Sequence, residues 1–170
     1  MKTIIAINGR PGVGKDTICD VVRRHFTTVN VSSVTPIKKI ALDYGWDGVK
    51  TDKSRKFLSD LKALFTEFND MPTSYLVGEA EKFMDSFATV FFAHIREGAE
   101  IDKFLSRARA MVGDEARVRS LLVRRAEVAR VVGNASDDEV ENYRYDWIYD
   151  NDGSLASLDA DFMEKFSKWQ

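Results

Sequence analysis

The chain alternates between short apolar runs and longer stretches in which apolar residues recur at helical spacing. Residues 3–8 and 87–95 are apolar on both faces, which is typical of strands buried inside a parallel sheet. The β-rich segments at 28–34, 117–123 and 145–149 predict further strands. Strands that alternate with helices predict an α/β fold with helices on both faces of the sheet. The ligand site is then expected at the carboxyl edge of the strands.

Helices are predicted wherever apolar side chains return every three or four residues. The first helix spans residues 14–26 and places Ile18, Val21, Val22 and Phe26 on one face. The others are expected at residues 37–44, at 54–68, at 72–87, through Ile101 to Leu105, and after residue 154. Thr35 before Pro36, and Ser154 after a turn at 151–153, are the predicted helix caps. Residues 124–143 are polar and have no clear period.

Composition narrows the choice of function. The 170 residues, 44% of them hydrophobic, can bury one sizeable core, so residues 1–170 are expected to form a single domain. A net charge of −2 argues against general binding to a nucleic acid polymer. No apolar run approaches the roughly 18 residues of a membrane span, and no membrane partner is expected. The single cysteine, Cys19, with two histidines excludes an internal disulfide and an ordinary zinc site, and favours the cytoplasm.

The candidate chemistry begins directly after the first strand. Residues 9–17 read Gly-Arg-Pro-Gly-Val-Gly-Lys-Asp-Thr, which contains the glycine, the four-residue spacer and the Gly-Lys pair of a phosphate-binding P-loop (Walker A motif). Glycines let successive backbone N–H groups face a phosphate, and a helix N-terminus adds partial positive charge. Lys15 is expected at the β/γ oxygens. The predicted nucleotide-binding residues in this segment are Gly9, Arg10, Gly12, Val13, Gly14, Lys15, Asp16 and Thr17.

Asp16 departs from the usual pattern, in which Ser or Thr follows the lysine and places a hydroxyl on Mg²⁺. Its carboxylate can hold the metal through water, while Thr17 donates to an α-phosphate. Alternatively, Asp16 is only a favourable negative charge in the first turn of a helix. Both interpretations stay open.

Three segments together resemble the deoxynucleoside monophosphate kinases, which are P-loop kinases related to adenylate kinases. They are the P-loop end at 14–17, the Thr-Pro-Ile-Lys-Lys-Ile-Ala segment at 35–41, and Tyr145-Asp146 with the Asn-Asp-Gly-Ser-Leu segment at 151–155. The resemblance implies a three-layer fold with a five-stranded parallel sheet in the order 2-3-1-4-5. It also implies a helical acceptor-binding region at 35–86, a lid at 124–143, and transfer of the γ-phosphoryl of ATP, with Mg²⁺, to a nucleotide monophosphate.

Positive charge on the migrating oxygens is the main requirement of phosphoryl transfer. Arg124 and Arg125, just past a strand, and Arg96, at the carboxyl end of another, are therefore candidate catalytic residues beside Lys15. Arg130 follows in the same polar stretch. A solvated charged surface is the alternative for all of these arginines except Arg96.

Further candidate binding residues are expected around the phosphate acceptor and around the adenine base of the donor. Lys38, Arg55 and Arg96 are predicted to bind the acceptor phosphate, with Lys39 and Lys56 as weaker candidates that surface charge explains equally well. The resemblance places Asn151 and Gly153 near the adenine base, although an Asp-Gly-Ser segment is also ordinary turn and cap chemistry.

One position weakens the expectation of full kinase activity. His94 stands where the resemblance calls for an acidic residue at a strand end, and Glu97 is the candidate to replace that acid. The leading hypothesis is a nucleoside monophosphate kinase. The alternatives are a kinase for another small metabolite, and a nucleotide-binding regulatory domain that transfers no phosphate.

Overall fold

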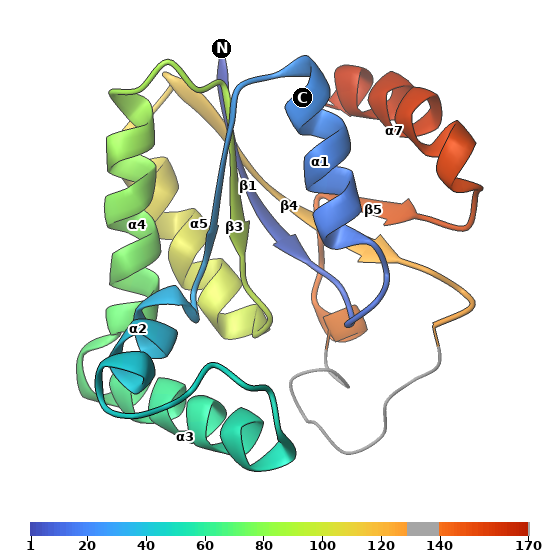
Figure 1. Cartoon of the computed structure of the whole chain (residues 1–170). Coiled ribbons are helices and arrows are strands. Elements are labelled where there is room, and N and C mark those ends of the chain that lie inside the picture. Colours follow the sequence, from blue (N-terminus) through green and yellow to red (C-terminus); the bar gives the residue numbers. More distant parts are fainter. Residues whose placement is uncertain (129–139, 170) are drawn as a thin grey trace.

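A computed structural model of the chain describes residues 1–128 and 140–169. Its centre is a five-stranded parallel sheet in the order β2-β3-β1-β4-β5, flanked by helices (Figure 1). The predicted α/β class and strand order are therefore confirmed. The strands are β1 (Lys2–Asn8), β2 (Thr28–Ser32), β3 (Val90–His94), β4 (Ala116–Arg124) and β5 (Trp147–Asp150). The helices are α1 (Lys15–His25), α2 (Thr35–Asp43), α3 (Asp52–Asn69), α4 (Met71–Met84), α5 (Gly98–Val112), the short η1 (Val140–Asn142) and α7 (Leu155–Trp169).

Each face of the sheet carries its own hydrophobic core. Ile4 and Ala6 of β1 pack toward α4 and α5, whereas Ile5 and Ile7 pack toward α1 and α7. Side chains alternate between the two faces of a strand, so a strand that is apolar at every position must be covered on both faces. In Figure 1 the two helix pairs lie on opposite sides of the sheet. A smaller cluster, built on Ile37, Ala41 and Leu58, joins α2 to α3.

Two details differ from the sequence prediction. Residues 87–89 precede β3, and Phe87 is fully exposed, because α4 ends in a turn in which the Ser86 hydroxyl donates to the Phe83 carbonyl. Thr35 is the first helical residue of α2 instead of its cap, and Val34 occupies the cap position without a side-chain hydrogen bond. Ser154 does cap α7, since its hydroxyl accepts from the backbone N–H of Ser157 at 3.2 Å.

All strand pairs are parallel, so their carboxyl ends meet at one edge of the sheet, the lower edge in Figure 1. The P-loop, the segment after β3, the start of the polar stretch after β4 and the loop after β5 all leave the sheet there. The α2–α3 region lies below the same edge. None of the helices in the described parts of the chain is long and apolar enough to cross a membrane.

Candidate phosphate-binding site

The P-loop has a backbone that only glycine adopts without strain. Gly12 and Gly14 have φ values of 84° and 96°, in the left-handed region. At Gly9 the obstacle is space, because a Cβ atom there would lie 2.4 Å from the Val123 carbonyl oxygen of β4. Gly14 is the N-cap of α1, so the unpaired N–H groups of the first helical turn lie at the end of this loop. The geometry is that of an anion-binding loop.

Lys15 lies across this loop. Its ammonium donates to the carbonyl oxygens of Gly9 and Arg10, the second at 3.0 Å. The ammonium is thus held against the backbone of the loop. A phosphate placed there would offer it a stronger, charge-assisted hydrogen bond.

Asn8 ties the start of the loop to two neighbouring segments, and the sequence analysis missed it. Its side-chain oxygen accepts from the Gly9 N–H at 2.8 Å. Its amide nitrogen donates to the Arg96 carbonyl at 2.8 Å and to the Tyr145 hydroxyl at 2.7 Å. Tyr145 in turn donates to the Val140 carbonyl, and its burial raises its pKa to about 12. The signal for this role in the sequence was an amide residue at the end of an apolar strand, directly before the first glycine of the P-loop.

The loop after β5 braces the P-loop from the other side. Asn151 is buried, and its amide donates to the Val13 carbonyl at 2.9 Å, while its backbone N–H donates to the Arg124 carbonyl. Asp152 accepts from the Ala126 N–H at 2.7 Å. Gly153 lies in the same loop, near the Ser157 hydroxyl. The structure thus places Asn151 directly against the predicted nucleotide-binding segment, with its amide turned to the loop backbone.

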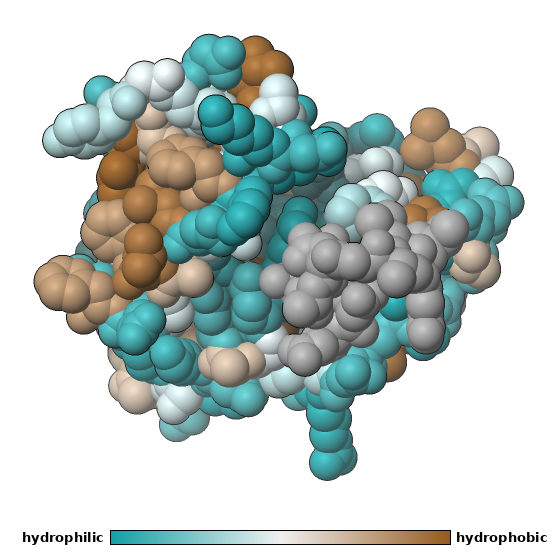
Figure 2. Space-filling view, turned by 90° about the horizontal axis from the view of Figure 1, so that it is seen from below, coloured by the Kyte–Doolittle hydropathy of each residue, from teal (hydrophilic) through white to brown (hydrophobic). Residues whose placement is uncertain are grey.

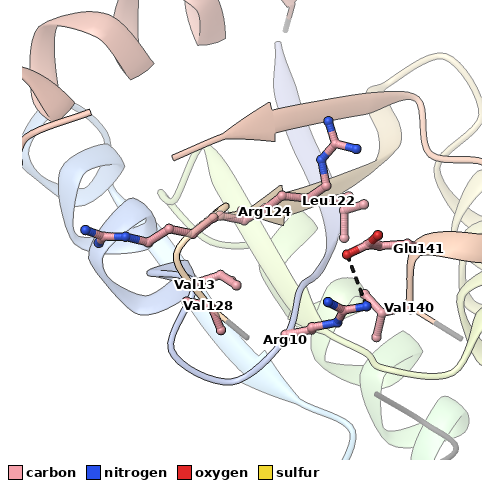
Figure 3. A pocket seen from close by; sticks show the side chains of 9 residues that line it. Arg10, Val13, Leu122, Arg124, Val128, Val140 and Glu141 are labelled. Carbon is pink, nitrogen blue, oxygen red and sulfur yellow. Dashed lines mark ion pairs between the residues drawn. The ribbon is translucent and has the colours of Figure 1, made fainter. Parts of the chain in front are cut away.

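Arginines and carboxylates line a hollow of about 380 Å³ beside the loop. Arg10 forms an ion pair with Glu141 of η1 at 3.2 Å, and the two side chains face each other in Figure 3. Arg124 binds Asp150 through two hydrogen bonds, at 2.8 and 3.1 Å, and this bonding raises its pKa. Arg125 lies 3.4 Å from Glu127. The hollow is lined by Arg10, Arg124, Arg125, Ala126, Val128, Glu141, Asp150 and Asp152. Arg130 and most of the predicted lid lie outside the described residues.

The first turn of α1 holds the two candidate metal residues. Asp16 is exposed and Thr17 is half-buried, directly after Lys15. Within the described residues, no three His, Cys, Asp or Glu side chains form a metal-binding group. This donor set fits an Mg²⁺ ion held mainly by phosphate oxygens and water, since Mg²⁺ keeps several waters and takes only one or two protein ligands.

His94 lies at the carboxyl end of β3, as expected, but its surroundings do not let it replace an acidic residue. Its Nε2 is 3.8 Å from the Cys19 sulfur and 3.4 Å from the Asn30 side-chain oxygen. Burial lowers the pKa of His94, although the nearby Asp16 opposes the effect. Burial also raises the pKa of Cys19, which therefore stays a thiol. A neutral imidazole in this position cannot supply the negative charge of the missing acid.

Glu97, the other candidate for that acid, is already engaged. The Lys62 ammonium of α3 lies 2.5 Å from a carboxylate oxygen of Glu97 and 2.8 Å from one of Glu100. Burial opposes ionisation of Glu97, but the Lys62 charge holds its pKa below the usual value, whereas burial raises the pKa of Glu100. Lys62 was also missed by the sequence analysis. Its signal was a lysine that interrupts the apolar face formed by Leu58 and Phe65.

The predicted acceptor-binding residues are spread over the helical region. Lys38 is half-buried on α2, and Arg55 is exposed on α3, 3.6 Å from Asp52. Arg55 shares a helix face with Lys62 and Thr66, which lie seven and eleven residues further along. Lys62 and Thr66 contact Glu97 and Glu100, so this face turns toward the β3–α5 edge, where Arg96 is exposed.

Figure 2 shows the carboxyl edge from below. Hydrophobic side chains gather at the left of the view, where α2 and α3 lie, and hydrophilic side chains surround a recess near the middle. The exposed apolar residues of α3 are Phe57, Leu64 and Phe68. The recess is thus polar, as a site for phosphates requires.

No protein-family model and no curated protein matches the sequence. Solved structures match along almost the whole chain. The tunicamycin resistance protein of Deinococcus radiodurans has a TM-score of 0.58 and 13% identity over 98% of this chain and 96% of that one. Shikimate kinase from Bacteroides thetaiotaomicron has a TM-score of 0.54 and 15% identity over 97% and 98%. Mycobacterium tuberculosis APS kinase, in complex with AMPPNP and APS, has a TM-score of 0.51 and 8% identity over 98% of each chain. The chain therefore has the fold of P-loop kinases.

The contact between Gly14 and Asn151 can be tested with alanine. A Cβ atom on Gly14 would lie 2.5 Å from the Asn151 amide nitrogen, whereas one on Gly12 would meet nothing within 4 Å. Both glycines have left-handed φ values, so each alanine carries a strain of about 1 kcal/mol. We expect Gly14→Ala to lower the free energy of unfolding in urea by more than Gly12→Ala.

The excess should depend on Asn151. In an Asn151→Ala background, the two glycine variants should lose the same stability, because the clash has been removed. An excess that persists in that background would place the cost of Gly14→Ala elsewhere.

Proposed function

We propose that the chain transfers the γ-phosphoryl group of ATP to a small phosphate acceptor, and that the acceptor is a nucleoside monophosphate. The observation that carries the proposal is the P-loop. A glycine-rich loop follows the central strand, opens a helix and accepts hydrogen bonds from the ammonium of Lys15 through the carbonyls of Gly9 and Arg10. The loop lies at the carboxyl edge of a parallel sheet, which is where α/β folds bind ligands.

The donor phosphates would be bound by the residues of this edge. Loop N–H groups and the start of α1 bind phosphate oxygens, and Lys15 exchanges its carbonyl acceptors for the β/γ oxygens. Arg124 and Arg125 line the hollow beside the P-loop, together with Arg10, and would add positive charge there. Asp16 and Thr17 are the residues that would hold Mg²⁺. The metal, when bound, neutralises part of the phosphate charge and orients it for transfer.

The acceptor would lie between this edge and the α2–α3 region. Arg96 follows β3, and the Arg55 face of α3 turns toward the same edge. Arginines at both borders suit an acceptor that carries its own phosphate, because guanidinium groups bind phosphates bidentately. This arrangement favours a monophosphate over a neutral sugar or alcohol as the acceptor.

A second candidate rests on His94. The expected acid is replaced by a neutral imidazole, and Glu97 is paired with Lys62. A nucleotide-binding domain that does not transfer phosphate would be compatible with this loss. Other small metabolites are also acceptors to be tested, since the fold is shared with shikimate kinase and APS kinase.

One panel separates these functions. The purified chain is incubated with ATP, Mg²⁺ and each common ribo- and deoxynucleoside monophosphate, then with shikimate and APS, and ADP formation is followed. Faster ADP release with a monophosphate supports the proposal. Nucleotide binding without stimulation by any acceptor favours the regulatory domain.

Replacement of Lys15 tests the phosphate site. Lys15→Ala removes a charge that donates to the loop carbonyls, and because Lys15 is half-buried outside the hydrophobic cores the change leaves no core cavity. We expect turnover to fall by about 100-fold or more, with the thermal unfolding midpoint nearly unchanged. Lys168→Ala is the control, because Lys168 is an exposed lysine paired with Glu164 on α7. Equal ATP affinity and turnover in the two variants would contradict the P-loop assignment.

Arg124 and Arg125 test the role of the hollow. Arg124→Ala breaks an exposed ion pair, and we expect it to lower the free energy of unfolding by at most about 1 kcal/mol. We expect a smaller loss of stability for Arg125→Ala. Turnover should fall by about tenfold or more in each variant, because these charges act on the phosphates. Steady-state kinetics and urea unfolding measure the two effects. Unchanged turnover per enzyme would assign both residues to the solvated surface.

The variant Asp16→Asn distinguishes the two interpretations of Asp16. If its carboxylate holds Mg²⁺ through water, Asp16→Asn should raise the Mg²⁺ concentration for half-maximal activity several-fold, with little change in metal-free ATP binding. If the residue only stabilises the helix start, its negative charge repels ATP. The variant would then bind metal-free ATP more tightly and keep its Mg²⁺ requirement. Calorimetry with and without Mg²⁺ distinguishes the two results.

A further inference from the structure

Lys62 is a nearly buried cation between two carboxylates. Its side chain is 12% exposed, and its ammonium lies 2.5 Å from Glu97 and 2.8 Å from Glu100. Thr66, one turn later, donates to the Lys62 carbonyl and lies 3.4 Å from Glu100. Lysine is almost never buried without a partner, and removing one member of a buried ion pair leaves an uncompensated charge. The cluster therefore fixes α3 at a defined distance from α5.

The cluster continues into the phosphate-binding edge. Glu97 is the N-cap of α5 and follows Arg96 directly in the chain. The Arg96 carbonyl accepts from the Asn8 amide, whose oxygen in turn accepts from the Gly9 N–H. An unbroken series of polar contacts and covalent bonds thus joins α3 to the first residue of the P-loop.

Other contacts also hold α3. Leu58 is the one buried residue of the helix, and it belongs, with the partly buried Leu61 and Phe65, to the small cluster shared with α2. Phe57, Leu64 and Phe68 are 48%, 64% and 81% exposed. Asp70, at the C-terminal end of α3, adds ion pairs to Lys103 and Arg107 of α5. The Lys62 cluster ties the middle of α3 to the start of α5, through Glu97 and Glu100.

We propose that Lys62 is a positioning residue for the acceptor: by bridging Glu97 and Glu100 it sets the distance between the acceptor-binding face of α3 and the Arg96 edge. The inference rests on the proposed function and adds a residue to it. Arg55 lies on the same face of α3 as Lys62, two turns earlier. A shift of α3 would separate Arg55 from Arg96 and weaken their joint hold on one phosphate. The P-loop, held by Asn8 and Asn151, would keep its geometry.

The test compares Lys62→Met with Lys53→Met, a matched change at an exposed lysine of the same helix. We expect Lys62→Met to raise the acceptor KM by about tenfold or more, since a small misplacement of binding groups is costly. ATP affinity by calorimetry should match that of the parent, and kcat should change less than KM. Lys62→Arg should restore part of the acceptor affinity, because it keeps a cation in place. Lys53→Met should behave as the parent.

A second variant covers the case in which Lys62→Met does not fold. Glu97→Gln and Glu100→Gln added to Lys62→Met remove the unpaired carboxylates, so folding should recover while the bridge stays absent. The acceptor KM should remain raised in this triple variant. An acceptor KM equal to that of the parent would overturn the proposal, and so would equal losses of acceptor and ATP affinity.

Amide hydrogen exchange separates this inference from the proposed function. If the parent transfers phosphate to none of the acceptors, the proposed function fails, and exchange then decides the role of the bridge. Faster exchange along α3 in Lys62→Met than in Lys53→Met, with the P-loop unchanged, supports the placement of α3 by Lys62. Equal exchange in the two variants overturns it.

Discussion

The hydrogen bonds of Asn8 are the interaction on which the site depends. One side chain at the end of the central strand holds the first N–H of the P-loop, the carbonyl of Arg96 and the hydroxyl of Tyr145. These three groups lie in the P-loop directly after β1, in the segment after β3 and in the segment before β5, so a single amide holds three separate segments of the chain together. The amide is buried, and a buried donor or acceptor left without a partner costs about 1–3 kcal/mol. The three segments are therefore coupled: none can move away without exposing or orphaning a polar group of another.

Two glycines of the P-loop, Gly9 and Gly14, add a second constraint on the loop, which acts through its backbone. Because Gly9 has no Cβ atom, the loop approaches β4 closely, and because Gly14 has none, Asn151 packs against the start of α1. The loop is thus pressed between the end of β4 and the loop after β5, and its N–H groups are directed before any ligand arrives. Preorganised donors of this kind bind developing charge without the cost of reorienting. In the strand order, β4 is next to β1 and β5 is next to β4, so the end of β4 and the loop after β5 lie on the same side of the P-loop. The chemistry of the loop thus depends on the topology of the sheet.

The parts that sequence predicted well are those in which local pattern and burial agree. β1 was predicted from a run that is apolar on both faces, and α1 from the glycine turn and the amphipathic period that follow it. The strand order followed from the resemblance of three separated segments to a known family. The end of α4 was harder, since Phe87 looks like a strand residue and is instead fully exposed after a serine-closed turn. The roles of Lys62 and Asn8 could not be recognised from the sequence, because they depend on distant partners. Glu97, the partner of Lys62, lies 35 residues away along the chain, and Arg96, a partner of Asn8, lies 88 residues away. A residue whose meaning comes from tertiary contacts carries only a faint local signal, such as a lysine within an apolar face.

Charge at the site is balanced within the chain, and this bears on how a phosphate would be bound. Arg10 is paired with Glu141, Arg124 with Asp150 and Arg125 with Glu127, while Lys15 is held by carbonyls. A nucleotide must therefore compete with carboxylates for the arginines and with the carbonyl oxygens of Gly9 and Arg10 for the lysine. Ion pairs at exposed positions contribute about 0–1 kcal/mol, so exchanging them for a multiply charged phosphate costs little. The same pairing neutralises the arginines while no phosphate is present. At the proposed site, a phosphate that fits the loop would gain the loop N–H groups together with these charges, so the loop would favour such a ligand.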